Sequence, residues 1–274
     1  MSEKLKGFPN CYIVTLEEST ERREYMKSEM DRLGLNYKFI EHKRIDNNPD
    51  LKVVGTDELL NSLTIGCCTS HLNTIKWWYE NTDEEEAVFM EDDVDFSTVD
   101  LWSFNWEDYV KKFGPLWDVL QLAIVHEGWP VMYPRHRNGW DHGLQVYLVK
   151  RHYAKRIIEF YFNPDDHNMI RFHKMPYVQK SDQNYRYNIT TENIVYGLGT
   201  VYVHPIFNHS LKFTQKSTIH EGGSVQPFVA EESHQYVKQW WENKASKGTL
   251  DELFSYRWCC PPPQQYSNVL HIDH

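Results

Sequence analysis

The densest chemical feature of the chain is a row of carboxylates behind a short apolar run. Ala87–Met90 leads directly into Glu91, Asp92 and Asp93, and Asp95 follows two residues later. Such a run predicts a buried strand, and open α/β sheets bind ligands at the carboxyl ends of their strands. Adjacent carboxylates repel each other and favour a hard divalent cation that bridges to phosphates. A solvated acidic turn is the alternative, and by spacing alone Asp95 is as good a ligand as Asp93.

Composition limits the classes of protein. The 274 residues include ten Trp and are 15% aromatic, which is typical of a packed globular protein. The net charge of −10 disfavours a nucleic-acid or anionic-membrane surface. No apolar run approaches the roughly 20 residues of a membrane helix, and the first residues lack the apolar core of a signal peptide, so we expect a cytoplasmic protein. The five cysteines are odd in number, which favours reduced thiols.

The beginning of the chain predicts a strand, a helix and a second strand. The apolar run 11–16 is a strand, and 36–40 is the next. Between them, apolar residues recur every three or four positions up to Leu33, and Gly34 stands where a helix ends. Arg22 falls in the first turn of this helix, where positive charge is disfavoured unless an anion lies nearby.

The remaining elements follow from the same patterns. We expect helices over 56–63, 65–79, 152–162 and 228–247, and strands over 87–90, 117–125, 143–149 and 195–203. The segment 127–142 contains Arg135, His136 and Arg137, and it is either a functional loop or an irregular surface excursion. The last dozen residues are expected to be a tail.

Taken in order, these landmarks resemble glycosyltransferase family 25, which includes collagen and lipooligosaccharide galactosyltransferases. The likeness covers about residues 8–225. It is carried by the opening strand and helix Ile13–Arg23, the Gly-Cys-x-x-Ser-His signature Gly66–His71, Glu91–Asp93, Trp117–Asp118, Val146–Ile158, Asp182 and Ser217–Ile219. The family's usual Asn-Leu-Asp at the end of the first strand is replaced here by Thr15, Leu16 and Glu17.

The resemblance implies a fold and an activity. The fold would be GT-A, an α/β architecture with a Rossmann-like, nucleotide-sugar-binding mixed sheet flanked by helices, over residues 8–225. Residues 226–274 would form a C-terminal helix and a Pro-rich tail that pack on or trail the same domain. The enzyme would move galactose or glucose from UDP-galactose or UDP-glucose to a hydroxyl of a glycan, protein or other acceptor, with inversion and with Mn²⁺ or Mg²⁺.

The resemblance also assigns roles to residues. Asp93, Glu91 and His220 would hold the metal, with His209 as the alternative to His220. The donor nucleotide would be bound by Thr15, Leu16, Glu17, Arg22, Ser70, His71, Glu91 and Asp92. Asp182 would be the general base that deprotonates the acceptor hydroxyl.

Two alternatives come from other classes of protein. A noncatalytic carbohydrate- or nucleotide-sugar-binding protein on a degenerate transferase fold would keep the same landmarks. Asp93-Val-Asp95 also has the Asp-x-Asp spacing of metal-dependent phosphatases. That motif normally lies near the start of its domain, and the sequence shows no companion elements before it.

Overall fold

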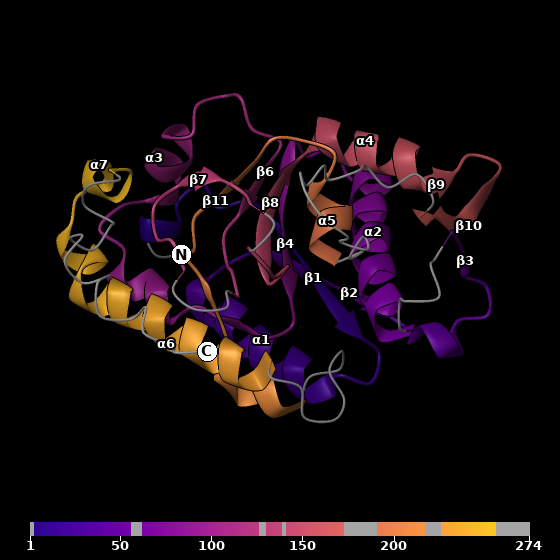
Figure 1. The fold of residues 1–274 in the computed structure, drawn as a ribbon, viewed down its shortest axis with the longest axis horizontal. Coiled ribbons are helices and arrows are strands. Elements are labelled where there is room, and N and C mark those ends of the chain that lie inside the picture. The colour runs from indigo at the N-terminus through magenta and orange to yellow at the C-terminus, as the bar shows by residue number, and fades with distance from the viewer. Residues whose placement is uncertain are drawn as a thin grey trace, which may run out of the picture.

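A mixed sheet with helices on both sides forms the centre of the molecule (Figure 1). The structure is a computed structural model that describes residues 3–55, 62–125, 130–138, 141–172, 191–216 and 226–255. Side chains 214–216 and 226–228 are outside this description. Within the described ranges, no helix has both the length and the apolarity needed to cross a bilayer.

The seven strands of the sheet lie in the order β2-β1-β4-β8-β6-β11-β7. Their bounds are β1 Cys11–Leu16, β2 Tyr37–His42, β4 Glu86–Glu91, β6 Val119–Gln121, β7 Arg135–His136, β8 Val146–Lys150 and β11 Val201–Val203. β1 is parallel to both β2 and β4, and β6 is parallel to β11. β8 is antiparallel to β4 and β6, and β7 is antiparallel to β11. The predicted α/β class with a mixed sheet and flanking helices is confirmed.

The other elements cover or extend this sheet. The helices are α1 Thr20–Leu33, α2 Ser62–Asn81, α3 Trp106–Lys111, α4 Arg151–Tyr161, α5 Thr191–Tyr196, α6 Gln226–Asn243 and α7 Leu250–Leu253. The 3-10 turns are η1 Glu3–Leu5, η2 Ile45–Asn47, η3 Ser97–Leu101, η5 Leu211–Lys216 and η6 Ala245–Lys247. β3 Lys52–Val54, β10 Asp166–Arg171 and β9 Phe162–Asn163 form a small sheet, and β5 Val94–Asp95 pairs with β12 Asn208–His209.

Two hydrophobic clusters lie on opposite faces of the sheet. One packs Cys11, Ile13, Val88 and Met90 against α1 and α6, and includes Trp241. The other packs alternate strand residues against α2, α4 and α5, whose positions beside the sheet are visible in Figure 1. Since successive strand side chains point to opposite faces, β4 contributes to both clusters. We call these the α1 face and the α2 face.

Several sequence-based boundaries are correct and others are wrong. β1 has the predicted bounds, and Gly34 ends α1 in the left-handed conformation at φ 67°. The predicted strand 195–203 is instead the end of α5 followed by β11, because Ile194–Tyr196 is buried against the α2 face and packing overrides its β-type composition.

Other strand predictions need smaller corrections. The predicted strand 117–125 is only three residues long in the sheet, and Val125 instead forms an isolated bridge with His142. Within the predicted loop 127–142, Arg135–His136 forms the edge strand β7, because its backbone pairs with β11. Most of the predicted helix 56–63 lies outside the described residues.

Candidate functional site

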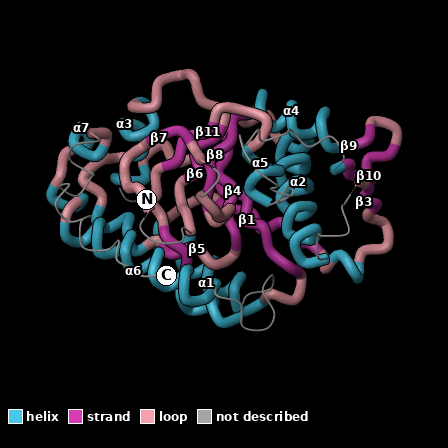
Figure 2. Tube along the Cα trace, viewed as in Figure 1, coloured by secondary structure: helices cyan, strands magenta, loops and turns pink. Residues whose placement is uncertain are grey.

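The acidic motif lies where β4 leaves the sheet. The last residue of β4 is Glu91. The turn that follows is formed by Asp92 and Asp93, and the chain then continues into β5. β1 is parallel to β4, with Val14 opposite Glu91, so the carboxyl ends of both strands meet at one edge. Figure 2 shows β5 beside α1 and α6, and the Tyr25 hydroxyl of α1 donates to the Val94 carbonyl at 3.0 Å.

On the α1 face, one arginine and one threonine hold the two aspartates. Arg22 Nη1 lies 2.8 Å from Asp92 Oδ1 and 2.9 Å from Asp93 Oδ2. The Thr15 hydroxyl donates to the other Asp92 oxygen at 2.6 Å. The aspartates thus supply the anions that the arginine in the first turn of α1 requires. The sequence predicted Thr15 and Arg22 as nucleotide ligands but not their direct contact with the acids.

The surroundings fix the position of this cluster. The Arg22 guanidinium lies 5.1 Å from the centre of the Phe213 ring. The Ser210 backbone N–H donates to the Asp93 carbonyl at 2.6 Å, next to the β5–β12 pairing. Asp93 Oδ1 is buried and has no hydrogen-bond partner among the described residues. One oxygen of the acidic cluster therefore remains available to a further cation.

The acids share more negative charge than Arg22 neutralises. Burial, followed by repulsion from Glu91, raises the pKa of Asp93 to about 7. Burial and the neighbouring Asp92 raise the pKa of Glu91 to about 7 as well. Arg22 opposes both shifts, but its single charge faces three carboxyl groups.

Glu91 belongs to the opposite face. Its Oε1 lies 3.5 Å from His71 Nε2, and His71 Nδ1 lies 2.8 Å from the Tyr147 hydroxyl oxygen. Cys67, one helical turn before His71, completes a group whose ligand atoms all lie within 4.8 Å of one another. The reduced thiols expected from the sequence include Cys67, and its spacing of four residues from His71 on a predicted helix is a signal for this group.

Three other predicted donor ligands form hydrogen bonds between a side chain and a backbone carbonyl. The Ser70 hydroxyl donates to the Gly66 carbonyl at 2.8 Å, within α2. The Leu16 and Glu17 carbonyls accept hydrogen bonds from the Arg23 guanidinium. The Glu17 side chain is exposed. Of the predicted donor ligands, Thr15, Arg22 and Asp92 meet on one face, and His71 meets Glu91 on the other.

Two predicted residues cannot be placed. Asp182 and His220 lie outside the described residues, as does Ser217–Ile219. The alternative ligand His209 is buried beside the acidic turn, where it pairs with Val94 across the β5–β12 ladder. Its ring centre lies 5.4 Å from that of the His234 ring.

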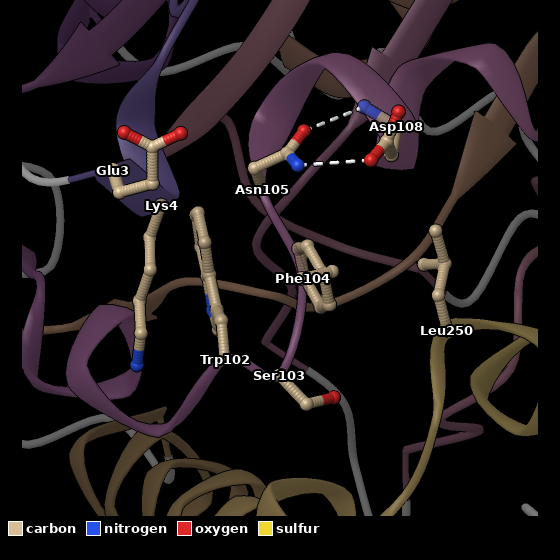
Figure 3. Close-up of a pocket in the computed structure, with 8 residues that line it drawn as sticks. All are labelled: Glu3, Lys4, Trp102, Ser103, Phe104, Asn105, Asp108 and Leu250. Atoms are coloured by element: carbon tan, nitrogen blue, oxygen red, sulfur yellow. Dashed lines mark hydrogen bonds between the residues drawn. The ribbon is translucent and has the colours of Figure 1, made fainter.

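A surface hollow occurs elsewhere in the molecule (Figure 3). It is lined by Glu3, Lys4, Trp102, Ser103, Phe104, Asn105, Asp108 and Leu250. In Figure 3 the Trp102 and Phe104 rings stand side by side while Asn105 bonds Asp108 at the start of α3. None of these residues is a predicted site residue, so we place the candidate site at the acidic strand end.

Comparison with known proteins bears directly on this site. Residues 8–107, which include β1, α1, α2 and the acidic turn, match the sequence model of glycosyltransferase family 25 (LPS biosynthesis protein). The predicted resemblance to this family is confirmed. The match supports a glycosyltransferase, and it spans both faces of the strand end. No curated protein sequence matches the chain.

Comparison with solved structures returns, among others, two chains of low similarity. One is A197 from STIV, with a TM-score of 0.43 at 10% identity over 73% of this chain and 83% of that chain. The other is a glycosyltransferase involved in the glycosylation of the major capsid of PBCV-1, with a TM-score of 0.39 at 12% identity over 82% of this chain and 98% of that chain.

Proposed function

We propose that this protein is a metal-dependent hexosyltransferase with a GT-A fold. It transfers galactose or glucose from UDP-galactose or UDP-glucose to a hydroxyl group of a glycan or protein, with inversion. The observation that carries the proposal is the pair Asp92 and Asp93 at the carboxyl end of β4, bridged by Arg22 inside the segment that matches the family. Ligands of open α/β sheets bind at such an edge.

The residues on the α1 face fit a hard divalent cation. The donors are carboxylate oxygens, which Mg²⁺ and Mn²⁺ prefer. Within the described part of the chain, Asp93 Oδ1 has no hydrogen-bond partner, and Arg22 balances only part of the negative charge. Asp93 is our proposed ligand on this face, and the other proposed ligands are Glu91, from the α2 side of the turn, and His220. A cation held there would neutralise the charge that develops on the leaving diphosphate.

The protein's own side chains have distinct tasks in this proposal. Thr15 orients Asp92 by donating a hydrogen bond, and Arg22 fixes the spacing between Asp92 and Asp93. Arg22 also offers guanidinium N–H groups to the diphosphate, since guanidinium groups match phosphate geometry. Leu16, Glu17 and Ser70 line the nucleotide side of the edge. Asp182 removes the proton from the acceptor hydroxyl as the general base.

The first experiment measures donor binding and turnover. The full chain is screened by thermal shift and by UDP release with UDP-galactose and UDP-glucose, with and without Mn²⁺, against glycan and peptide hydroxyl acceptors. We expect one donor to raise the melting temperature and to be turned over only with metal. Binding without turnover over the whole acceptor panel would instead support a noncatalytic binding protein, and no shift with any nucleotide sugar would refute the proposal.

A second experiment tests the stereochemistry and the base. Both donors carry an α-linked sugar, so inversion predicts a β-linked product, which proton NMR of the anomeric position detects. Asp182→Asn should abolish transfer while the thermal shift with the donor is retained. An α-linked product, or transfer that persists in Asp182→Asn, would contradict the assigned general base.

A further inference from the structure

A second set of metal-ligating atoms occurs on the α2 face, separate from the aspartate pair. The Cys67 thiol, the His71 imidazole and the Glu91 carboxylate each offer one ligand atom, and these atoms lie within 4.8 Å of one another. Cys67 and His71 are one turn apart on α2, and Glu91 is the last residue of β4. We propose that these three residues form a binding site for a borderline-soft divalent metal ion such as Zn²⁺.

The types of ligand select the metal. Thiolate and imidazole ligands favour Zn²⁺ and related ions, whereas Mg²⁺ and Mn²⁺ favour oxygen. The thiol proton leaves when the metal binds, so that the thiolate and Glu91 together balance the two charges of the ion. The α2 face therefore differs in chemistry from the oxygen ligands of the α1 face.

Tyr147 prepares His71 for metal binding. Its hydroxyl oxygen lies 2.8 Å from Nδ1, and this hydrogen bond places the proton on Nδ1 when the hydroxyl accepts it. Nε2, which faces Glu91 at 3.5 Å, then carries the lone pair that a metal requires. Metal-binding histidines commonly have such a partner on the other ring nitrogen, and its loss weakens metal binding.

The cluster is accessible and incomplete. His71 is buried, but the Glu91 side chain is 22% exposed and Cys67 is half-buried. The described residues supply three protein ligands, which leaves a fourth position for water or an exchangeable ligand, as in catalytic rather than structural zinc sites. An ion can therefore enter from the same strand end at which the acids lie.

Cys68 provides a matched control. It is the next residue on α2, but its buried thiol donates to the Thr191 hydroxyl at 3.4 Å. Cys67 and Cys68 are consecutive residues of the same helix, and their side chains point in different directions around its axis. Because Cys68 is the more deeply buried of the two, Cys68→Ser controls for any disturbance of α2 by a lost thiol, while metal binding should depend on Cys67.

The test is a titration of metal-free, tag-free full chain with Co²⁺, followed by absorption spectroscopy. We expect one equivalent to produce a near-ultraviolet thiolate-to-cobalt charge-transfer band, which Zn²⁺ removes and Mg²⁺ does not. Cys67→Ser should lose the band, whereas Cys68→Ser and the double variant Cys259→Ser/Cys260→Ser should keep it. No thiolate band in the wild type, or an unchanged band in Cys67→Ser, would overturn the proposal.

Two milder variants keep both thiols and test the hydrogen-bond partner of His71 and the ligand Glu91. Tyr147→Phe removes only the hydroxyl and should weaken Co²⁺ binding by about 10- to 100-fold with the band retained. Glu91→Gln should weaken binding while circular dichroism remains unchanged. Unaltered Co²⁺ affinity in both variants would refute the proposed geometry. Because the readout is metal binding and not sugar transfer, the result is independent of the proposed function, although Glu91 takes part in both.

Discussion

The two faces of the sheet end in different chemistry at the same edge. On the α1 face, Thr15, Arg22 and the aspartates form a charged oxygen cluster. On the α2 face, His42 bonds the Thr74 hydroxyl at 2.8 Å, and His71 bonds Tyr147. The first face is made of ionic groups, and the second of imidazoles and hydroxyl groups with the Glu91 carboxylate and the Cys67 thiol.

Strand alternation explains this division. In β4, Val88 and Met90 point to the α1 face, and Ala87 and Phe89 point to the α2 face. The residue after Phe89 in this alternation is Glu91, which accordingly meets α2. Neighbouring carboxylates in the sequence are thereby directed to opposite sides of the sheet. A contiguous acidic motif can thus serve two separate sites.

The two faces should also respond oppositely to pH. Asp93 has a folded-state pKa of about 7, above its ordinary value, so its contribution to stability falls as pH rises toward 7. Burial, followed by the charge of His71, lowers the pKa of His42 to about 4, so its contribution falls as pH decreases from about 6.5 toward 4. Measurements on variants of each face can separate these effects.

The largest expected effect is on transfer. Asp93→Asn removes a carboxylate charge from the α1 face and should lower kcat/KM by about 10²–10³-fold. Glu85→Gln, which changes an exposed acid seven residues before the turn, should leave transfer unchanged. Steady-state UDP release measures both. Comparable activity of Asp93→Asn and Glu85→Gln would remove the α1 face from the reaction.

The next effect is on stability. Arg22→Gln leaves one buried and one half-buried carboxylate without their cation and should lower the free energy of unfolding by about 3 kcal/mol in metal-free buffer. Arg32→Gln removes a more exposed ion pair with Glu29 and should change the free energy of unfolding by less than about 0.5 kcal/mol. Urea titration of both variants measures the difference. Equal losses would show that Arg22 contributes no special charge compensation.

A smaller effect concerns the α2 face. Between pH 7 and pH 5, His42 becomes protonated in the unfolded chain but not in the folded chain. The free energy of unfolding of the wild type should therefore fall by about 2 kcal/mol more than that of His42→Gln. The acids of the α1 face are present in both proteins and cancel in this difference. Urea titrations at the two pH values provide the test, and parallel losses in both proteins would contradict a neutral buried His42.

The smallest effect compares one threonine from each face. Thr15→Val removes a hydrogen bond to a charged carboxylate and should cost about 1.5 kcal/mol. Thr74→Val removes one to a neutral imidazole, together with the bond that its hydroxyl donates to the Ser70 carbonyl one turn earlier in the helix, which adds little to stability, and should cost about 1 kcal/mol. Thermal unfolding of the two variants measures the order. A reversed order would argue against the ionic character assigned to the α1 face.

The sequence predicted local elements best where their signals were local. β1 follows from an unbroken apolar run, and the end of α1 follows from Gly34, which adopts a left-handed conformation that favours glycine. The segment 195–203 was predicted as a strand because β-branched and aromatic residues are typical of strands. The same residues also suit a helix that is buried between other elements, as the end of α5 is. Residue type alone could not distinguish these two environments.

The sequence by itself determined the acidic strand end, the alternation of β4 and the family resemblance, because each depends on residues close together in the chain. Only the tertiary structure decided which partners these residues meet. Arg22 and Asp92 are 70 residues apart, and His71 and Tyr147 are 76 apart. Their contacts depend on the order and direction of strands in the sheet, which a local pattern does not specify.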